Sequence, residues 1–277
     1  AWIPTPSRSR RREPRSPICA IAGAAAAAAS DEPMRLGTRS STLALAQAEA
    51  VAAALGGAEV VPVRTADADV GDKARFVRGI EAALLEGDAD LGVHSAKDLP
   101  GELPDGLELV GVPVRQDPSD AFVGAADSLA AVGDGARIGT SSLRRRSQLL
   151  ALRPDLEVAE LRGNVDTRLG RLEAGDYDGI VLATAGLARL GRRGEIAFRF
   201  ELEALTPAPG QGCRALEARA DDGEAAAAAG RMSDRAALTE LTAERAATRS
   251  LGASCDTPVG ICARFDGAEL SVSGYAG

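Results

Sequence analysis

Histidine, lysine and aromatic residues are scarce in this chain. Among 277 residues there is one histidine, and aromatic residues make up 3%. Of the 32 basic residues, only Lys73 and Lys97 are lysines, and the others are arginines. One histidine and cysteines without a Cys-x-x-Cys spacing do not supply the ligands of a typical zinc site, so we expect no bound metal. Few aromatic residues also leave no platform on which nucleic-acid bases could stack.

Long apolar runs and nucleotide-binding loops are missing as well. No apolar run reaches the roughly 18 residues that cross a bilayer, and the longest candidate is the alanine-rich stretch 18–29. The sequence contains no Gly-x-Gly-x-x-Gly and no Walker-type loop. We therefore expect no membrane insertion and no nucleotide cofactor.

The charge and the cysteine content narrow the possible partners and compartments. A formal net charge of −8 and a pI near 4.9 disfavour a polynucleotide or an anionic membrane as the main partner. The four cysteines, Cys19, Cys213, Cys255 and Cys262, are irregularly spaced and predict a reducing compartment rather than a disulfide framework. Any anionic ligand must then be bound by a local cluster of cations.

The first 30 residues differ from the rest in composition. They contain five arginines, several serines and prolines, one acidic residue and an alanine tract. This pattern is typical of an organelle transit peptide, and we expect delivery to the plastid stroma, with the mitochondrion or the cytoplasm as alternatives. A disordered basic arm or an artefact of the gene prediction would explain the same composition.

From Pro33 onward short apolar strands alternate with amphipathic helices, which is typical of an α/β architecture. We expect two similar lobes, periplasmic-binding-protein-like and joined by a hinge at the Pro/Gly-rich segment 207–212, followed by a small α+β domain. The expected strands are 35–37, 60–63, 90–93, 137–139, 156–161, 180–183, 214–218, 259–265 and 270–272, and the expected helices are 41–55, 76–85, 142–152, 165–172 and 234–249. A two-stranded sheet with one helix is thin for a domain, so we expect the last domain to be truncated.

Two helix starts repeat about 102 residues apart. The segments 37–41 (Gly-Thr-Arg-Ser-Ser) and 139–142 (Gly-Thr-Ser-Ser) each lie between an expected strand and an expected helix. Hydroxyl N-caps and free backbone N–H groups make such a helix start an anion site, and ligands of open α/β sheets bind at the carboxyl ends of strands. Ordinary capping of two unrelated helices is the alternative interpretation.

Lys97 and Asp98 follow the expected strand 90–93 and therefore lie at its carboxyl end. A carboxylate there can stabilise a developing cation or transfer a proton; a surface pair before a turn proline is the alternative. We interpret His94 as structural, because neighbouring strand residues face opposite ways and Ser95 cannot pair with it in a hydrolase triad.

Several arginines gather at helix starts and strand ends, where they would oppose the helix dipole unless an anion compensates them. Bidentate guanidinium forks suit carboxylates and phosphates, so the cluster predicts a ligand with several such groups. Solvated arginines that pair with an acidic surface are the alternative. The cluster consists of Arg39, Arg144, Arg145, Arg146, Arg162 and Arg168.

Cys255 lies in a loop rich in glycine, serine and proline just after the expected helix 234–249. This position suits an accessible thiol that forms a covalent bond. Cys262 falls in an alternating strand, and we expect it to be buried.

Four separated motifs resemble those of the porphobilinogen deaminase (hydroxymethylbilane synthase) family. They are 93–100 (Val-His-Ser-Ala-Lys-Asp-Leu-Pro), 139–145 (Gly-Thr-Ser-Ser-Leu-Arg-Arg), 161–165 (Leu-Arg-Gly-Asn-Val) and 167–169 (Thr-Arg-Leu), supported by 37–41 and by 242–245 (Thr-Ala-Glu-Arg). The resemblance runs from about Met34 to the last residue. It implies a transferase (EC 2.5.1.61) that joins four porphobilinogen molecules head to tail, with loss of ammonia, into the linear tetrapyrrole hydroxymethylbilane.

The resemblance also implies a cofactor and a set of site residues. The family's dipyrromethane would be attached to Cys255 through a thioether, and Asp98 would be the catalytic carboxylate. Lys97, Ser142, Arg144 and Arg145 would hold the carboxylates of the cofactor. The incoming porphobilinogen or the growing oligopyrrole would be bound by Arg39, Ser41, Lys73, Phe76, Arg162, Arg168 and Arg189, with Lys73 and Phe76 in a mobile loop over the site.

The chain departs from the family pattern in two places. About six residues of the mobile loop are missing between Arg64 and Lys73, and Ala253-Ser254 replaces a pair of glycines before Cys255. The implied division is domain 1 at 33–117 with 207–230, domain 2 at 118–206 and an incomplete domain 3 at 231–277. We expect a monomer. A two-lobe anion-binding protein without catalysis and a degenerate fragment are the competing hypotheses.

Overall fold

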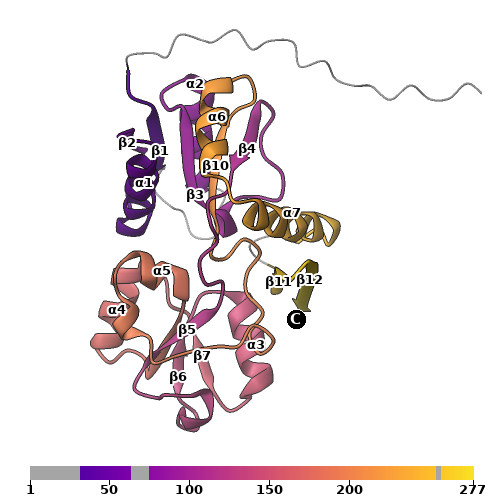
Figure 1. Ribbon diagram of the computed structural model, residues 1–277. Helices are drawn as coiled ribbons and strands as arrows, with labels where there is room; N and C mark the ends of the chain where they lie inside the picture. The colour runs from indigo at the N-terminus through magenta and orange to yellow at the C-terminus, as the bar shows by residue number, and fades with distance from the viewer. Residues whose placement is uncertain (1–31, 64–74, 254–256) are drawn as a thin grey trace, which may run out of the picture. The chain divides into compact units, whose positions relative to one another are not determined.

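The computed structural model describes residues 32–63, 75–253 and 257–277, and the segments 1–31, 64–74 and 254–256 lie outside the described residues. Within residues 32–277, the chain forms two five-stranded mixed sheets and a C-terminal helix with a two-stranded hairpin (Figure 1). The α/β class is thus confirmed.

The first sheet has the order β2-β1-β3-β10-β4. Its parallel half consists of β1 (Arg35–Arg39), β2 (Glu59–Val63) and β3 (Leu91–Ser95). The antiparallel half consists of β10 (Arg214–Arg219), which pairs with β3, and β4 (Leu107–Gly111). The helices of this part are α1 (Thr42–Ala54), α2 (Arg75–Glu86) and α6 (Gly223–Met232), and the short 3₁₀ turn η1 (Ala96–Asp98) follows β3.

The second sheet repeats this plan in the order β7-β6-β8-β5-β9. Three strands are parallel, namely β6 (Arg137–Gly139), β7 (Glu157–Ala159) and β8 (Gly179–Ala183), and two run antiparallel to their neighbours, β5 (Asp120–Gly124) and β9 (Phe198–Arg199). Its helices are α3 (Leu143–Leu152), α4 (Val165–Glu173) and α5 (Thr184–Arg189), with 3₁₀ turns η2 (Leu129–Ala131) and η3 (Arg193–Glu195). Each sheet therefore has a parallel half whose strand ends can carry a site.

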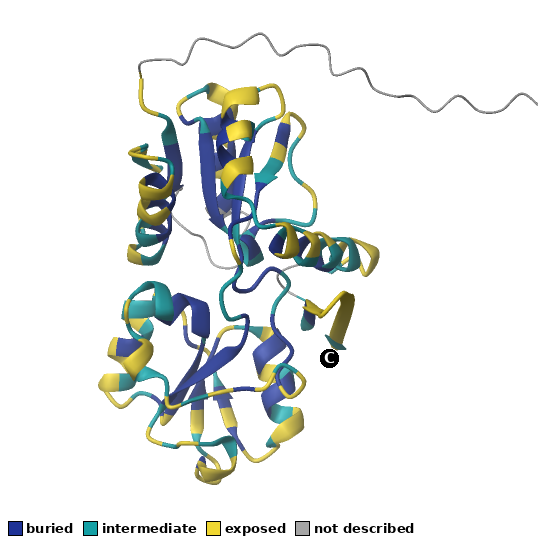
Figure 2. Cartoon of the chain, viewed as in Figure 1, coloured by how far each residue is buried: buried dark blue, intermediate teal, exposed yellow. Residues whose placement is uncertain are grey.

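The last part of the chain is helix α7 (Arg235–Ser250) and the hairpin of β11 (Val259–Asp266) and β12 (Glu269–Ala276). The start of β11 is buried against α7, whereas β12 is almost entirely exposed (Figure 2). Two segments connect the sheets, 112–119 between β4 and β5 and 200–213 between β9 and β10. We refer to them as the two crossing segments.

Local sequence explains how the helices after the strands begin. Ser41, Ser142 and Asn164 lie just before α1, α3 and α4, and each side chain accepts a hydrogen bond from a backbone N–H in the first turn. Such caps satisfy donors that the helix itself leaves unpaired. The predicted repeat of strand, hydroxyl cap and helix is thus confirmed in both sheets.

The structure also corrects several expected elements. The strand expected at 156–161 ends at Ala159, so Arg162 lies in a loop. Strands β4, β5 and β9 and helix α5 are not among the expected elements; the two-residue β9 and the six-residue α5 carry too little periodicity to stand out. The proposed domain boundaries stay a prediction. None of the helices in the described part of the chain is long and apolar enough to span a bilayer.

Candidate functional site

Three of the predicted site residues surround one cavity at the carboxyl ends of β1 and β3. Arg39, Ser41 and Asp98 line this cavity of about 50 Å³ together with Gln47 and Ser95. Arg39 Nη1 lies 4.0 Å from Asp98 Oδ2. Burial lowers the pKa of Arg39, and the Asp98 carboxylate offsets part of that shift. The parallel strands β1 and β3 thus bring Arg39, from the segment 37–41, next to Asp98, from the motif 93–100.

The turn η1 fixes Lys97 and Asp98 immediately after β3. Gly210 of the second crossing segment has a φ of +74°, and a Cβ atom there would meet the backbone of Ala96 and Lys97 at 2.9–3.0 Å. Only glycine combines that backbone conformation with so close an approach. The crossing segment therefore packs directly on the backbone that presents Lys97 and Asp98.

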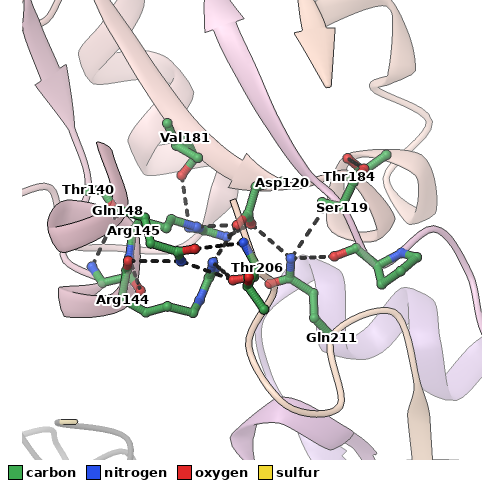
Figure 3. Close-up of polar contacts among 12 residues, drawn as sticks. Ser119, Asp120, Thr140, Arg144, Arg145, Gln148, Val181, Thr184, Thr206 and Gln211 are labelled. Atoms are coloured by element: carbon green, nitrogen blue, oxygen red, sulfur yellow. Dashed lines mark hydrogen bonds and ion pairs between the residues drawn. The ribbon is translucent and has the colours of Figure 1, made fainter. Parts of the chain in front are cut away.

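Arg144 and Arg145 in the first turn of α3 are both buried, and both bind Asp120 at the start of β5 (Figure 3). Arg144 Nη1 lies 2.8 Å from Asp120 Oδ2, and Arg145 Nη2 lies 2.7 Å from Asp120 Oδ1. Burial alone would raise the pKa of Asp120, but the two guanidinium groups hold it well below its ordinary value. An internal carboxylate thus neutralises part of the charge of the arginine pair. Ser142 caps α3, since its hydroxyl oxygen accepts from the backbone N–H of Arg145, and a hydroxyl that accepts in this way still has its O–H to donate.

The two arginines around α4 differ in their surroundings. Arg162 is exposed and forms an ion pair with Glu160 at 2.6 Å. Arg168 donates from Nε to the carbonyl of Gly163 at 2.8 Å. Burial and then the charge of Arg145 lower the pKa of Arg168, the charge of Asp98 offsets part of this, and the resulting pKa is about 10. Arg168 is therefore electrostatically coupled to both the arginine pair and the predicted catalytic carboxylate.

Arg189 at the end of α5 is held by neutral oxygens. Its Nε donates to Gln116, its Nη1 to the side-chain oxygen of Gln47 and its Nη2 to the carbonyl of Gly212, at 2.7–2.9 Å. Burial, together with the charge of Arg214 at the start of β10, lowers the pKa of Arg189 to about 10. Burial also lowers the pKa of Arg214, whose buried Nε has no hydrogen-bond partner among the described residues. A spot with two cations and no acidic partner favours an anionic ligand.

The balance of charge at the predicted site is positive. Apart from the exposed Arg162–Glu160 pair, the described residues of the predicted site include six guanidinium groups, on Arg39, Arg144, Arg145, Arg168, Arg189 and Arg214, and two carboxylates, Asp98 and Asp120. Uncompensated buried charges are costly unless a counter-ion binds. The arrangement therefore suits a ligand with several carboxylates, in a chain whose total charge is negative.

Comparison with known proteins identifies the family to which this chain belongs. A family model described as "Porphobilinogen deaminase, dipyromethane cofactor binding domain" matches residues 34–227. The porphobilinogen deaminase of Roseiflexus sp. (strain RS-1) is 47% identical over 258 residues, which cover 87% of this chain and 85% of that protein. That of Xanthomonas oryzae pv. oryzae (strain KACC10331 / KXO85) is 46% identical over 259 residues, covering 88% and 85%. This chain belongs to the porphobilinogen deaminase family.

Membership in the porphobilinogen deaminase family settles the class of activity. The chain is a transferase of tetrapyrrole biosynthesis that acts on porphobilinogen, and the family model is that of a dipyrromethane-binding domain. Among solved structures, protein PG110 from Staphylococcus aureus aligns with a TM-score of 0.46 and 14% identity, covering 76% of this chain and 91% of that one. So distant a likeness carries no further conclusion.

The predicted site fits the family's cofactor by charge. A dipyrromethane built from porphobilinogen carries an acetate and a propionate on each ring. Arg144 offers a buried Nε that has no hydrogen-bond partner among the described residues, and Arg145 adds a second guanidinium group at the same carboxylate, Asp120. Two predicted residues, Lys73 and Cys255, lie outside the described residues, as does the side chain of Phe76.

Sequence reasoning missed two residues of this site. Asp120 was not singled out, because its arginine partners lie 24 and 25 positions further along the chain and no local motif links them. Arg214 was taken only as the start of a strand; its position directly after the Pro/Gly-rich crossing segment was the available signal. The interpretation of His94 as structural is supported, since its buried Nε2 lies 2.9 Å from Glu217 Oε2.

Cys213 and Cys262 are buried thiols. Burial raises the pKa of Cys213 to about 12 and that of Cys262 to about 11. At neutral pH the thiolate of Cys213 is therefore roughly 1,000-fold rarer than for an ordinary cysteine. Neither thiol suits covalent attachment of a cofactor in the folded protein.

We predict that N-ethylmaleimide at pH 8 leaves Cys213 and Cys262 unmodified in the native protein and labels both after unfolding. Because only the thiolate reacts, labelling of the native protein should rise with pH toward 11–12 instead of levelling off near 9. Peptide mapping of the labelled protein measures this. Equal labelling rates before and after unfolding would contradict it.

Proposed function

We propose that the porphobilinogen deaminase reaction of this chain takes place at Asp98, between Arg39 of β1 and the arginines of the second sheet. The observation that supports this most directly is the single carboxylate at the carboxyl end of β3, which lies 4.0 Å from Arg39 and interacts electrostatically with Arg168. Arg39 on one side and Arg168 on the other thus place positive charge next to this carboxylate. It can then stabilise a positive charge that develops next to it.

In each condensation the aminomethyl carbon of the incoming porphobilinogen loses ammonia. It forms a carbon–carbon bond to the free α-carbon of the pyrrole already bound, and that α-carbon releases a proton. The positive charge that develops on the pyrrole nitrogen as ammonia leaves would lie against the Asp98 carboxylate. The same carboxylate is placed to accept a hydrogen bond from that N–H group. The cofactor, when bound, supplies the pyrrole to which the first substrate molecule is joined.

The remaining residues bind carboxylates in this proposal. Lys97, Ser142, Arg144 and Arg145 hold those of the cofactor, and Arg39, Ser41, Lys73, Phe76, Arg162, Arg168 and Arg189 bind the incoming ring or the growing chain. The burial of Arg144 and Arg145 and the exposure of Arg162 agree with this order, because a permanent group belongs deep in the site and a growing chain extends outward.

The cofactor is attached to Cys255 in this proposal. The two described cysteines are buried and have raised pKa values, which disfavours both as nucleophiles. Cys19 lies in the N-terminal segment that precedes the matched family region. Cys255, which follows the matched residues 34–227 and lies between α7 and β11, is assigned the thioether because the family resemblance aligns the attachment cysteine with it.

We expect intact-mass analysis of residues 31–277, under denaturing conditions, to show an increase of two linked pyrrole units. Peptide mapping should place them on Cys255, and a Cys255→Ala variant should lack them. An unmodified, cooperatively folded protein after incubation with porphobilinogen would leave the non-catalytic anion binder as the better hypothesis.

The Asp98→Asn variant should lose at least about 100-fold in turnover while it keeps the cofactor mass, since an amide has the shape of the carboxylate but not its charge. Turnover is measured as hydroxymethylbilane formation. Asp105→Asn, on an exposed turn of the same part of the chain, is the matched control and should be unaffected. Normal turnover of Asp98→Asn would overturn the role of Asp98.

We further propose that residues 1–30 direct the chain to the plastid stroma, on the strength of their arginine-rich, acid-poor composition. A fluorescent protein fused behind these residues should accumulate in plastids of plant or algal cells. Replacement of the five arginines by glutamates should abolish the accumulation in plastids. Fluorescence in mitochondria or in the cytoplasm would overturn the plastid address.

The domain division and the oligomeric state complete the proposal. Domain 1 comprises 33–117 with 207–230, domain 2 comprises 118–206 and domain 3 begins at 231. Each sheet then lies within one domain, and the two crossing segments lie at the boundary. All proposed site residues come from one chain, so a monomer suffices for activity.

A further inference from the structure

Asp120 is the most densely bonded side chain of the arginine network in Figure 3. It is fully buried at the start of β5. Its Oδ1 accepts from Arg145 Nε at 3.0 Å, from Arg145 Nη2 at 2.7 Å and from Gln211 Nε2 at 2.8 Å. Its Oδ2 lies 2.8 Å from Arg144 Nη1. One carboxylate thus holds two guanidinium groups and one amide.

These contacts leave the two arginines in different states. Arg145 is used on every side, because its Nη1 also donates to the carbonyl of Val181 at 2.9 Å. Arg144 donates from Nη1 to the carbonyl of Thr206 at 2.7 Å, and its buried Nε has no hydrogen-bond partner among the described residues. Arg144 is therefore fixed in position with an unused donor, and Arg145 adds positive charge beside it.

The same carboxylate connects the arginines to both crossing segments. Gln211 Nε2 donates to Asp120 and also to the carbonyl of Pro118 at 2.7 Å. Thr206 is bound by Arg144 and by Gln148, whose side-chain oxygen accepts from the Thr206 N–H at 2.7 Å. A shift of Asp120 would thus move the arginine pair relative to both segments.

We infer that Asp120 is a positioning residue for the cofactor: it fixes Arg144, whose Nε is unused, for a cofactor carboxylate, holds Arg145 beside it as a second positive charge, and anchors both arginines to the crossing segments. Asp120 does not bind the ligand itself, because its two oxygens already contact Arg144, Arg145 and Gln211. Two guanidinium groups and one carboxylate leave a net positive charge, which a carboxylate of the ligand compensates. This inference rests on the proposed assignment of Arg144 and Arg145 to the cofactor.

The test is the rate of cofactor loading. Full-length protein is purified without cofactor from cells that make no porphobilinogen, porphobilinogen is added, and the gain in mass is followed under denaturing conditions. Asp120→Asn should load at least 10-fold more slowly than the unaltered protein. It should also need a higher porphobilinogen concentration for half-maximal rate, because the carboxylate-binding group is misplaced.

Asp90→Asn is the matched control. Asp90 accepts from the backbone and side chain of Arg35 in the first sheet, at 2.6–3.2 Å, away from the arginine pair. Both variants lose a carboxylate bound to arginine, and urea unfolding measures the stability that each loses. A merely structural role for Asp120 predicts loading rates that follow stability in both variants; the positioning role predicts slow loading in Asp120→Asn alone.

Two further variants keep the inference testable if Asp120→Asn does not fold. Gln211→Met retains the ion pairs, removes the amide that joins Asp120 to Pro118, and should slow loading as well. Arg144→Gln tests the assignment on which the inference rests. One outcome overturns the positioning role and leaves the proposed function standing: Arg144→Gln loads slowly, but Asp120→Asn loads normally. If Asp120→Asn does not fold, normal loading of a folded Gln211→Met gives the same result. If Arg144→Gln loads normally, the assignment of the arginines fails first.

Discussion

Glu244 and Arg115 form a buried ion pair that connects both crossing segments to α7 and β11. Glu244 is fully buried in α7, and it accepts from Arg115 Nη1 at 2.8 Å, from the Gly210 N–H at 2.6 Å and from the Ala263 N–H at 2.7 Å. Arg115 also donates to the carbonyls of Gln211 and Ala263. Burial lowers the pKa of Arg115, but the Glu244 carboxylate more than reverses this and raises it. Breaking a buried pair by removing one partner costs about 3–5 kcal/mol, so both crossing segments, α7 and β11 depend on this contact together.

Buried arginines satisfy the backbone of the crossing segments in the same way elsewhere. The crossing segments belong to neither five-stranded sheet, yet much of the segment 200–213 is buried, and buried carbonyls need donors. Arg144 donates to the carbonyl of Thr206, Arg115 to that of Gln211 and Arg189 to that of Gly212. The residues that bind the crossing backbone are thus in part the residues proposed to bind carboxylates. Ligand binding and the geometry of the crossing segments are therefore coupled through shared side chains.

The sequence predicts the site where the signal is local, and it misses the site where the signal is spread over the chain. Ser41 and Ser142 could be recognised because a hydroxyl between a strand and an amphipathic helix is a short motif, and both are caps in the structure. Asp98 could be placed because it directly follows a buried strand. Asp120 could not, because its role arises only when β5 is inserted antiparallel beside β8, a pairing that no local pattern encodes. The same pairing explains why β5 itself was overlooked.

The preference for arginine over lysine at this site follows from the number of acceptors that each cation serves. Arg145 binds Asp120 through Nε and Nη2 and the carbonyl of Val181 through Nη1, and Arg189 reaches three separate oxygens. An ammonium group is a compact point charge that cannot span such positions, whereas the planar guanidinium fork does. Since Arg144 supports the backbone at Thr206 and still has its Nε available, one side chain can hold the protein and a ligand carboxylate together. Lysine at position 144 could not contact the Thr206 carbonyl and a ligand carboxylate at the same time. The arginine that the composition of the whole chain favours therefore has a specific chemical role at this position.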